Sequence, residues 1–164
     1  MPPPDLFLYS DEFQRIQAIL QRLRQDSSAN VVFLVDKNGQ QIAAVGDLET
    51  LDTTSLASLT AGNVAATDGL ARLIGEREFS ILFHEGEKDH LHISIVGERV
   101  ILVVIFDDRS SLGLVRLRVR RATAELAKVF QEAAAKGEKE SLVADLETPF
   151  SEITEEDIDR LFSE

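Results

Sequence analysis

The chain has 164 residues, 44% of them hydrophobic, which is enough for one globular domain with a single sizeable core. It contains no cysteine, and this excludes a disulfide framework, a thiol nucleophile and a cysteine-based zinc site. Its net charge of −12 at pH 7 repels phosphate backbones, so neither nucleic acids nor anionic membrane surfaces are expected partners.

The first predicted elements are a helix and a β-hairpin. Residues 10–25 place apolar side chains at helical spacing along one face. Residues 31–35 form a continuous run typical of a strand buried on both faces, and residues 41–45 form a second strand. Between them, Asn38 and Gly39 favour the positive φ angles of a tight turn, so the two strands are predicted to pair as a hairpin.

A long helix is predicted over residues 52–74, with Asp52 as its N-cap and Gly75 at its end. At 100° per residue, one face carries the larger residues Leu56, Leu59, Asn63, Leu70 and Ile74. The opposite face carries Ser58, Ala61, Gly62, Ala65 and Gly69. Small residues allow close approach either by the chain's own sheet or by another protein. We predict an interface with a partner, because the large face can supply the core.

Three strands and a last helix complete the predicted fold. The strands lie at residues 80–85, 91–96 and 100–106, and the apolar third one is a candidate for the centre of the sheet. This apolar run is the longest in the chain, and it is much shorter than the ~20 residues of a membrane-spanning helix, so no membrane insertion is expected. Residues 110–135 alternate like a strand at their start, but the helical pattern extends through Ala135 and a helix is predicted.

The end of the sequence is strongly acidic. Residues 137–164 contain ten acidic and two basic residues, a net charge of −8, which leaves −4 for the other 136 residues. We expect a domain over residues 1–135, a flexible acidic linker over 136–150, and an amphipathic binding segment over 151–164. Two helical turns are marginal alone, so this segment is expected to order on binding, through Ile158, Leu161 and Phe162. The alternative is a disordered, solubilising tail.

The order helix-strand-strand-helix-strand-strand-strand-helix resembles the roadblock/dynein light-chain superfamily. The resemblance is carried by residues 31–39, 51–66, 83–86 and 103–109. It implies an α/β (α+β) roadblock fold in three α/β/α layers. A central five-stranded antiparallel sheet has the long helix on one face and the other two helices on the opposite face. The resemblance also implies that two copies pair through the long helix and the strand at residues 80–85. That strand is expected at an edge of the sheet, where backbone groups are unpaired.

The resemblance also implies a function. Bacterial members of the superfamily regulate Ras-like GTPases of cell polarity and gliding motility. We therefore expect a cytoplasmic homodimer, compatible with a place at a cell pole, that acts as a GTPase-activating protein with two chains per GTPase. It would remodel the partner's active site, to which GTP and Mg²⁺ bind, and would need no cofactor and no catalytic residue of its own. The C-terminal segment also has a weak likeness to acidic peptides that bind receiver domains.

Two other functions remain open. One is a non-catalytic roadblock scaffold that localises a GTPase or another polarity protein. The other is a small-molecule sensor, because related folds hold ligands between a sheet and its helices. The sequence shows no convergent set of polar residues, which makes the sensor the weaker alternative.

Five arginines invite the idea of an arginine finger, a cation that stabilises the charge on a transferring phosphoryl group. They are Arg109, Arg116, Arg118, Arg120 and Arg121. We expect them instead to form a solvated helix face, because the resemblance implies action through the GTPase's own catalytic residues.

The histidines and the paired aspartates carry weaker chemical signals. His90 and His92 share one face of a strand, a spacing that can seat a metal, and His84 is close in sequence. No cysteine or further histidine completes a ligand set, so we expect surface histidines and no metal site. Asp107 and Asp108 follow a strand, and we expect them to cap the helix that comes next.

Overall fold

The computed structural model describes residues 10–151, with side chains described through Lys139. The elements are α1 (Ser10–Ser27), β1 (Val31–Asp36), β2 (Gln41–Gly46), α2 (Thr53–Leu73), β3 (Ile81–His84), β4 (His90–Val96), β5 (Val100–Phe106) and α3 (Leu112–Ser151). The predicted order of helices and strands is confirmed.

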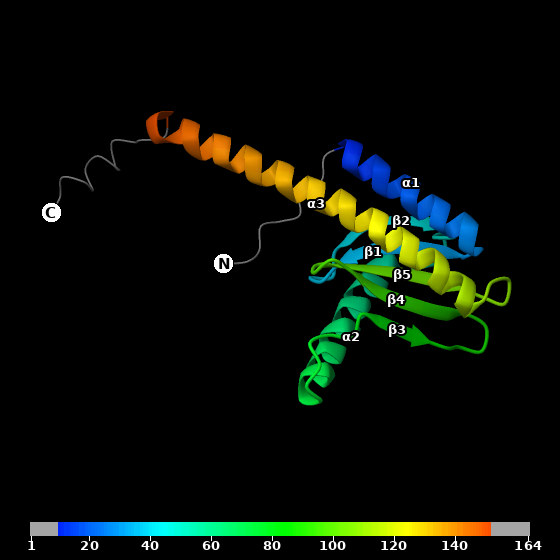
Figure 1. Ribbon diagram of the computed structural model, residues 1–164. Coiled ribbons are helices and arrows are strands. Elements are labelled where there is room, and N and C mark those ends of the chain that lie inside the picture. Colours follow the sequence, from blue (N-terminus) through cyan, green and yellow to red (C-terminus); the bar gives the residue numbers. More distant parts are fainter. Residues whose placement is uncertain (1–9, 152–164) are drawn as a thin grey trace.

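The strands form one antiparallel five-stranded sheet in the order β2-β1-β5-β4-β3 (Figure 1). β5 lies at its centre, as the apolar run predicted, and β2 and β3 lie at the edges. The β1–β2 turn is also confirmed. Gly39 has a φ of 91°, and its N–H donates to the carbonyl of Asp36 at 3.0 Å. The edge position of β3 leaves one side of that strand without a neighbouring strand within the described residues.

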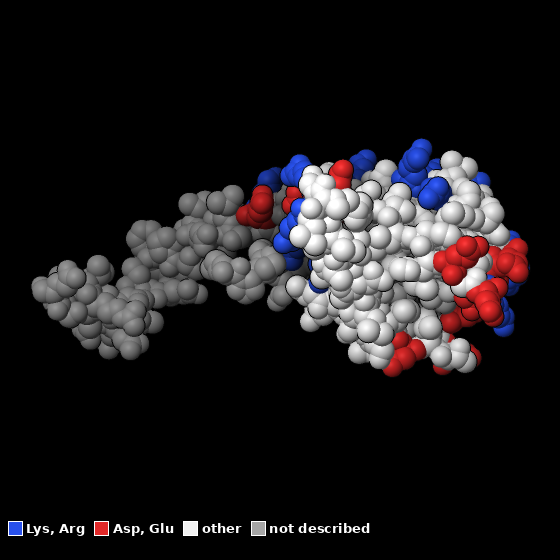
Figure 2. Space-filling model, turned by 90° about the horizontal axis from the view of Figure 1, so that it is seen from below, with Lys and Arg blue, Asp and Glu red and all other residues white. Residues whose placement is uncertain are grey.

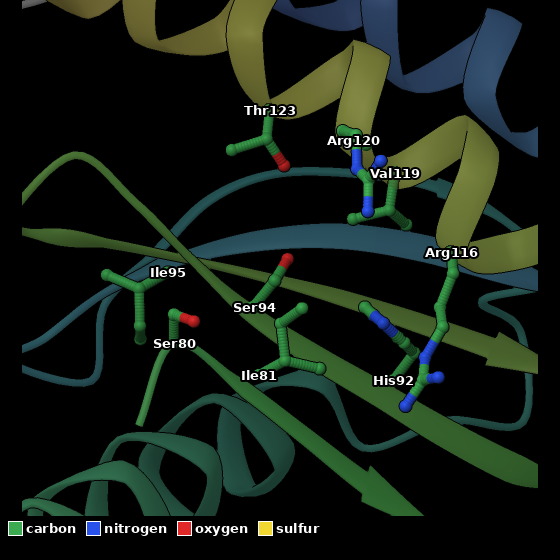
Figure 3. Close-up of a pocket in the computed structure, with 9 residues that line it drawn as sticks. All are labelled: Ser80, Ile81, His92, Ser94, Ile95, Arg116, Val119, Arg120 and Thr123. Carbon is green, nitrogen blue, oxygen red and sulfur yellow. The ribbon is translucent and has the colours of Figure 1, made fainter. Parts of the chain in front are cut away.

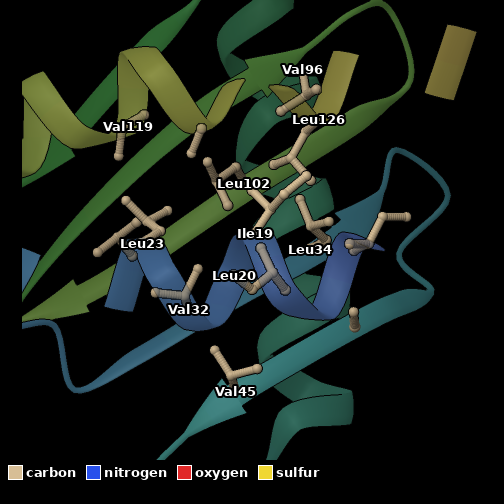
Figure 4. Packing of buried hydrophobic residues seen from close by; sticks show 14 of the residues in the cluster. Ile19, Leu20, Leu23, Val32, Leu34, Val45, Val96, Leu102, Val119 and Leu126 are labelled. Atoms are coloured by element: carbon tan, nitrogen blue, oxygen red, sulfur yellow. The ribbon is translucent and has the colours of Figure 1, made fainter. Parts of the chain in front are cut away.

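Helices cover both faces of the sheet, α1 and α3 on one and α2 on the other (Figure 1). Between the sheet and α1 and α3 lies the larger core, which includes Leu20, Leu34, Leu102, Val119 and Leu126 (Figure 4). A second core lies beneath α2 and includes Val31, Phe33, Val35, Ile101 and Val103. The predicted three-layer α/β/α roadblock arrangement is confirmed.

α3 begins as a helix, as predicted, because its apolar stripe is buried against the sheet. Its predicted end at Ala135 is wrong, since residues 136–150 continue the helix and do not form an irregular linker. Most residues of this stretch are good helix formers, and Gly137 disfavours a helix by only about 1 kcal/mol relative to alanine. An ion pair at 3.5 Å between Lys136 Nζ and Glu12 Oε1 also joins α3 to α1 beyond the predicted end.

Two further expectations concern the C-terminal segment and membranes. Ile158, Leu161 and Phe162, the predicted contact residues of the segment, lie outside the described residues. Within residues 10–151, none of the helices is both long enough and apolar enough to cross a membrane.

Candidate interaction surface

Local sequence signals fix both ends of α2. The Asp52 carboxylate accepts hydrogen bonds from the Ser55 hydroxyl at 2.6 Å and the Ser55 N–H at 3.1 Å. Both hydrogen bonds lower the pKa of Asp52, and the bond from the hydroxyl has the larger effect. At the other end Gly75 has a φ of 83°, and the N–H of Glu76 donates to the carbonyl of Ala71 at 2.8 Å. The predicted N-cap and glycine stop are both confirmed, and α2 is held in a defined position.

α2 packs on the sheet through small side chains. Its buried residues are Ala57, Thr60, Ala61, Val64 and Ala71. The prediction that its larger residues face the core is wrong, because Leu59, Leu70 and Ile74 are 73%, 61% and 69% exposed. Only Leu56 and Asn63 of that set are partly buried. The physical reason is that the strands beneath already present large aromatic and β-branched side chains, so small residues fill the space between helix and sheet.

The predicted small face divides into two parts. Ser58 and Ala61 lie over the β1–β2 turn, where a Cβ built on Gly39 would be 3.4 Å from Ser58 Cα and 3.7 Å from Ala61 Cβ. Ser58 is nonetheless exposed, as are the remaining members Gly62, Ala65 and Gly69. A Cβ on either of these glycines would meet no described atom within 4 Å. The chain's own packing therefore explains Ser58 and Ala61 but not the two glycines.

The edge strand β3 lies next to α2. It pairs with β4 on one side, and its other side presents backbone donors and acceptors that a further strand could take. The side-chain nitrogen of Asn63 on α2 lies 3.2 Å from Nε2 of His84 on β3. This contact joins the long helix to the sheet edge, so the two elements present one continuous surface.

That surface is apolar and nearly free of charge. Its exposed apolar side chains are Leu59, Leu70 and Leu73 on α2 and Ile74 just beyond the end of the helix. Together with the free edge of β3 they form what we call the α2 face. Asp68 and Arg72 are the charged residues of the 21-residue helix. Figure 2 looks onto this side from below and shows a broad uncharged area with acidic and basic groups at its margins. Contiguous apolar surface of this kind marks interaction sites in soluble proteins.

The roadblock likeness of the sequence is confirmed by comparison with known proteins. The Roadblock/LC7 domain profile matches residues 15–106. The chain belongs to the Roadblock/LC7 family. No match was found among curated proteins.

Solved structures give a closer comparison. MglB of Myxococcus xanthus is 61% identical, with a TM-score of 0.74, over 78% of this chain and 96% of that chain. The gliding protein mglB of Thermus thermophilus is 34% identical, with a TM-score of 0.74, over 79% and 98%. A structure described as MglB with tetrameric arrangement is also 34% identical, with a TM-score of 0.75, over 80% and 98%. This roadblock chain is therefore similar to MglB proteins over most of its length.

The aspartates before α3 of this roadblock domain do not cap the helix as predicted. The carboxylate of Asp107 accepts from Arg109 Nε at 3.1 Å, from the Arg109 N–H at 3.0 Å and from Asn30 Nδ2 at 3.1 Å. The Arg109 side chain is the main reason that the pKa of Asp107 falls to about 2. The cap is Ser111, whose hydroxyl accepts from the Leu114 N–H at 3.2 Å. Asp107 therefore holds the β5–α3 connection in place, and the Arg109 side chain forms an ion pair with it.

The other arginines considered for a finger lie on the far side of the roadblock sheet. Arg116, Arg118, Arg120 and Arg121 belong to α3, whereas α2 covers the opposite face (Figure 1). Arg121 pairs with Glu125 at 3.3 Å. None of these four arginines contributes to the α2 face.

The histidines differ in their surroundings. His92 is only 1% exposed, so the prediction of a surface histidine is wrong for it; α3 covers this face of β4. His84 is exposed, and His90 packs against the rings of Phe83 and Phe106, with centroid distances of 6.1 and 5.2 Å. In the part of the chain that the structure describes, no three histidine or carboxylate side chains form a group that could hold a metal.

Proposed function

We propose that this roadblock chain forms a homodimer that binds a Ras-like polarity GTPase of the MglA type and accelerates GTP hydrolysis by that partner. The observation that carries the proposal is the α2 face, which is exposed, nearly uncharged and continuous with an unpaired sheet edge. The 61% identity to Myxococcus xanthus MglB supports the choice of GTPase.

The dimer would form through β3 and α2. Pairing of two β3 strands satisfies the free β3 edge of each sheet, and it brings the two α2 helices to the same side of the joined sheet. The exposed leucines of α2 would then be buried between chains, where each leaves water at a gain of about 25 cal/mol per Å² of apolar surface.

The GTPase would bind where the two helices lie together. Gly62, Ala65 and Gly69 are exposed and small, so they permit close approach of a partner's backbone. Each glycine disfavours the helix by about 1 kcal/mol relative to alanine. Because the two glycines bring no packing advantage within the chain, contact with a partner accounts for them.

Catalysis would take place entirely on the partner. Binding would favour the conformation in which the GTPase's own residues meet the γ-phosphate and the attacking water. A partner seated on the α2 face does not meet the arginines of α3, which lie across the sheet. On this proposal the chain needs no cofactor of its own, because GTP and Mg²⁺ belong to the GTPase.

Phosphate release from a GTP-loaded MglA-type GTPase, with and without this protein, tests the proposal. We expect a large acceleration. Binding that leaves the rate unchanged would contradict activation and support the scaffold alternative.

A substitution at the proposed seat tests its location. Ala65→Arg or Gly69→Arg, at exposed positions, should abolish capture of the GTPase while the chain remains folded by circular dichroism. Leu117→Arg is the matched control, because Leu117 is 61% exposed on α3 and lies outside the α2 face. Unchanged capture by the first two variants would exclude this seat.

A further inference from the structure

A pocket of about 380 Å³ lies between α3 and the strands β4 and β3, across the sheet from the α2 face (Figure 3). Its floor includes His92 and Ser94 of β4, and its roof includes Thr123 of α3. The volume falls within the roughly 300–1,000 Å³ that is usual for small-molecule sites. Ser80 and Ile81 also line the pocket, so its outer wall adjoins the β3 edge proposed for the dimer. His92, Ser94 and Thr123 belong neither to that edge nor to the proposed GTPase seat.

The pocket contains buried polar atoms without partners. His92 and Ser94 are 1% and 4% exposed, and neither ring nitrogen of His92 nor Oγ of Ser94 has a hydrogen-bond partner among the described residues. Thr123 Oγ1 is likewise buried and unpaired there. In Figure 3 the hydroxyls of Ser94 and Thr123 point toward each other across the cavity. An unsatisfied buried polar group costs about 1–3 kcal/mol of stability. A ligand that forms hydrogen bonds with several of these atoms removes that cost at each of them.

The charge at the pocket is positive. Arg116 and Arg120 line it from α3, and no aspartate or glutamate does. Neither arginine forms an ion pair within residues 10–139, whereas the neighbouring Arg121 is paired with Glu125 at 3.3 Å. Burial, and then the charge of Arg116, lower the pKa of His92, which leaves its ring neutral at pH 7 with one donor and one acceptor nitrogen. Two free guanidinium groups above neutral donors and acceptors suit an anionic ligand.

We propose that this pocket binds a small organic anion, whose carboxylate or phosphate is held by Arg116 and Arg120. The polar part of the same molecule would hydrogen-bond to His92, Ser94 and Thr123. The size of the pocket suits a small molecule, and the deep position of the three polar groups requires a ligand that enters it, not one that only contacts the helix surface.

Nuclear magnetic resonance of the three histidine rings in the ¹⁵N-labelled full chain tests the proposal. His92 is assigned by the loss of its signals in His92→Gln. The probes are citrate for carboxylates and inorganic phosphate for phosphates, each titrated to millimolar concentration at constant ionic strength set with chloride. We expect the His92 ring signals to move saturably with at least one probe, and those of exposed His84 to stay unchanged.

Variants of the exposed arginines locate the anion. The Arg116→Gln/Arg120→Gln double variant should weaken the affinity for the probe at least about tenfold, because it removes two charge-assisted contacts. Arg121→Gln is the control, and it should leave the affinity unchanged. His92 signals that respond to neither probe, or that follow ionic strength alone, overturn the proposal. An equal loss of affinity in the Arg121→Gln control would also overturn it, since it would show attraction to the whole helix.

Discussion

The side-chain nitrogen of Asn63 on α2 lies 3.2 Å from Nε2 of His84 on β3, so a polar contact joins the two elements that form the α2 face. The core beneath α2 is otherwise built mainly on the inner strands β1, β5 and β4. The contact thereby helps to set the position of the helix relative to the edge strand, and with it the shape of the surface offered to a partner.

A double-mutant cycle with Asn63→Ala and His84→Ala measures this contact. We expect a coupling free energy of about 0.5–1.5 kcal/mol in urea unfolding, the usual contribution of a single hydrogen bond. The single variants should also weaken GTPase activation, because the helix and the edge strand are no longer held together. Strict additivity of the two variants would show that the contact does not couple α2 to β3.

Alanine at Gly62 or Gly69, the two exposed glycines of α2, should raise the stability of the chain and weaken its binding to the GTPase. Gly62→Ala and Gly69→Ala should each stabilise a single folded chain by up to about 1 kcal/mol, because the added Cβ meets no described atom within 4 Å. The same variants should weaken GTPase binding, since the methyl group occupies the surface used for close approach. Thermal unfolding and titration calorimetry measure the two effects.

Gly137→Ala is the matched control for the glycine variants. Gly137 lies in α3, and a Cβ there also meets no described atom within 4 Å, but the residue is remote from the α2 face. It should gain stability without any change in GTPase binding. If all three glycine variants bind the GTPase as the unmodified chain does, the close-approach account of Gly62 and Gly69 is wrong.

Leu73→Glu should dissociate the proposed homodimer. Leu73 is 84% exposed in the single chain, so a charge there costs the fold little but would be buried between two chains in the dimer. Sedimentation velocity should show a shift from dimer to monomer. Leu117→Glu, at a leucine 61% exposed on α3, should leave the dimer intact. A Leu73→Glu protein that remains dimeric would remove α2 from the dimer interface.

Asp107→Asn should destabilise the protein at neutral pH but not in strong acid. The folded-state pKa of Asp107 is lowered from 3.8 to about 2, so its carboxylate contributes stability that is fully present above about pH 4. This contribution is lost as the pH falls through about 2, below which the carboxyl is protonated in both states. The melting temperatures of the variant and the unmodified chain should therefore converge at low pH. Asp108→Asn changes the charge equally at a side chain that is 95% exposed, and it should leave the melting temperature at neutral pH nearly unchanged.

Much of the fold follows from local signals in the sequence. Asn38 and Gly39 predict the hairpin turn, because a tight turn needs residues that accept positive φ angles. The apolar run of β5 predicts the central strand, because a strand buried on both faces needs apolar side chains on both. The end of α3 is harder to predict, because no such local signal marks it. The residues that follow Ala135 carry no strong stop signal, and their polarity is equally typical of a linker.

The site is harder to predict than the fold, because periodicity shows that a helix has two faces but not which one meets the core. Size alone places Leu59 and Leu70 in the core, whereas the residues of α2 that are buried on the sheet are mostly small. The shortage of charge along α2 is the available signal for an interface. Similarly, the alternating polar residues His92 and Ser94 indicate a solvent-facing side of β4, and only the tertiary position of α3 shows that this side is buried.

Phosphate release from a GTP-loaded MglA-type GTPase, measured against increasing amounts of this protein, distinguishes activation by the homodimer from binding alone. We expect a large acceleration that saturates near two chains per GTPase and is lost in Ala65→Arg. An unchanged rate at full occupancy, or an acceleration that survives Ala65→Arg, would contradict activation by a homodimer through its α2 face.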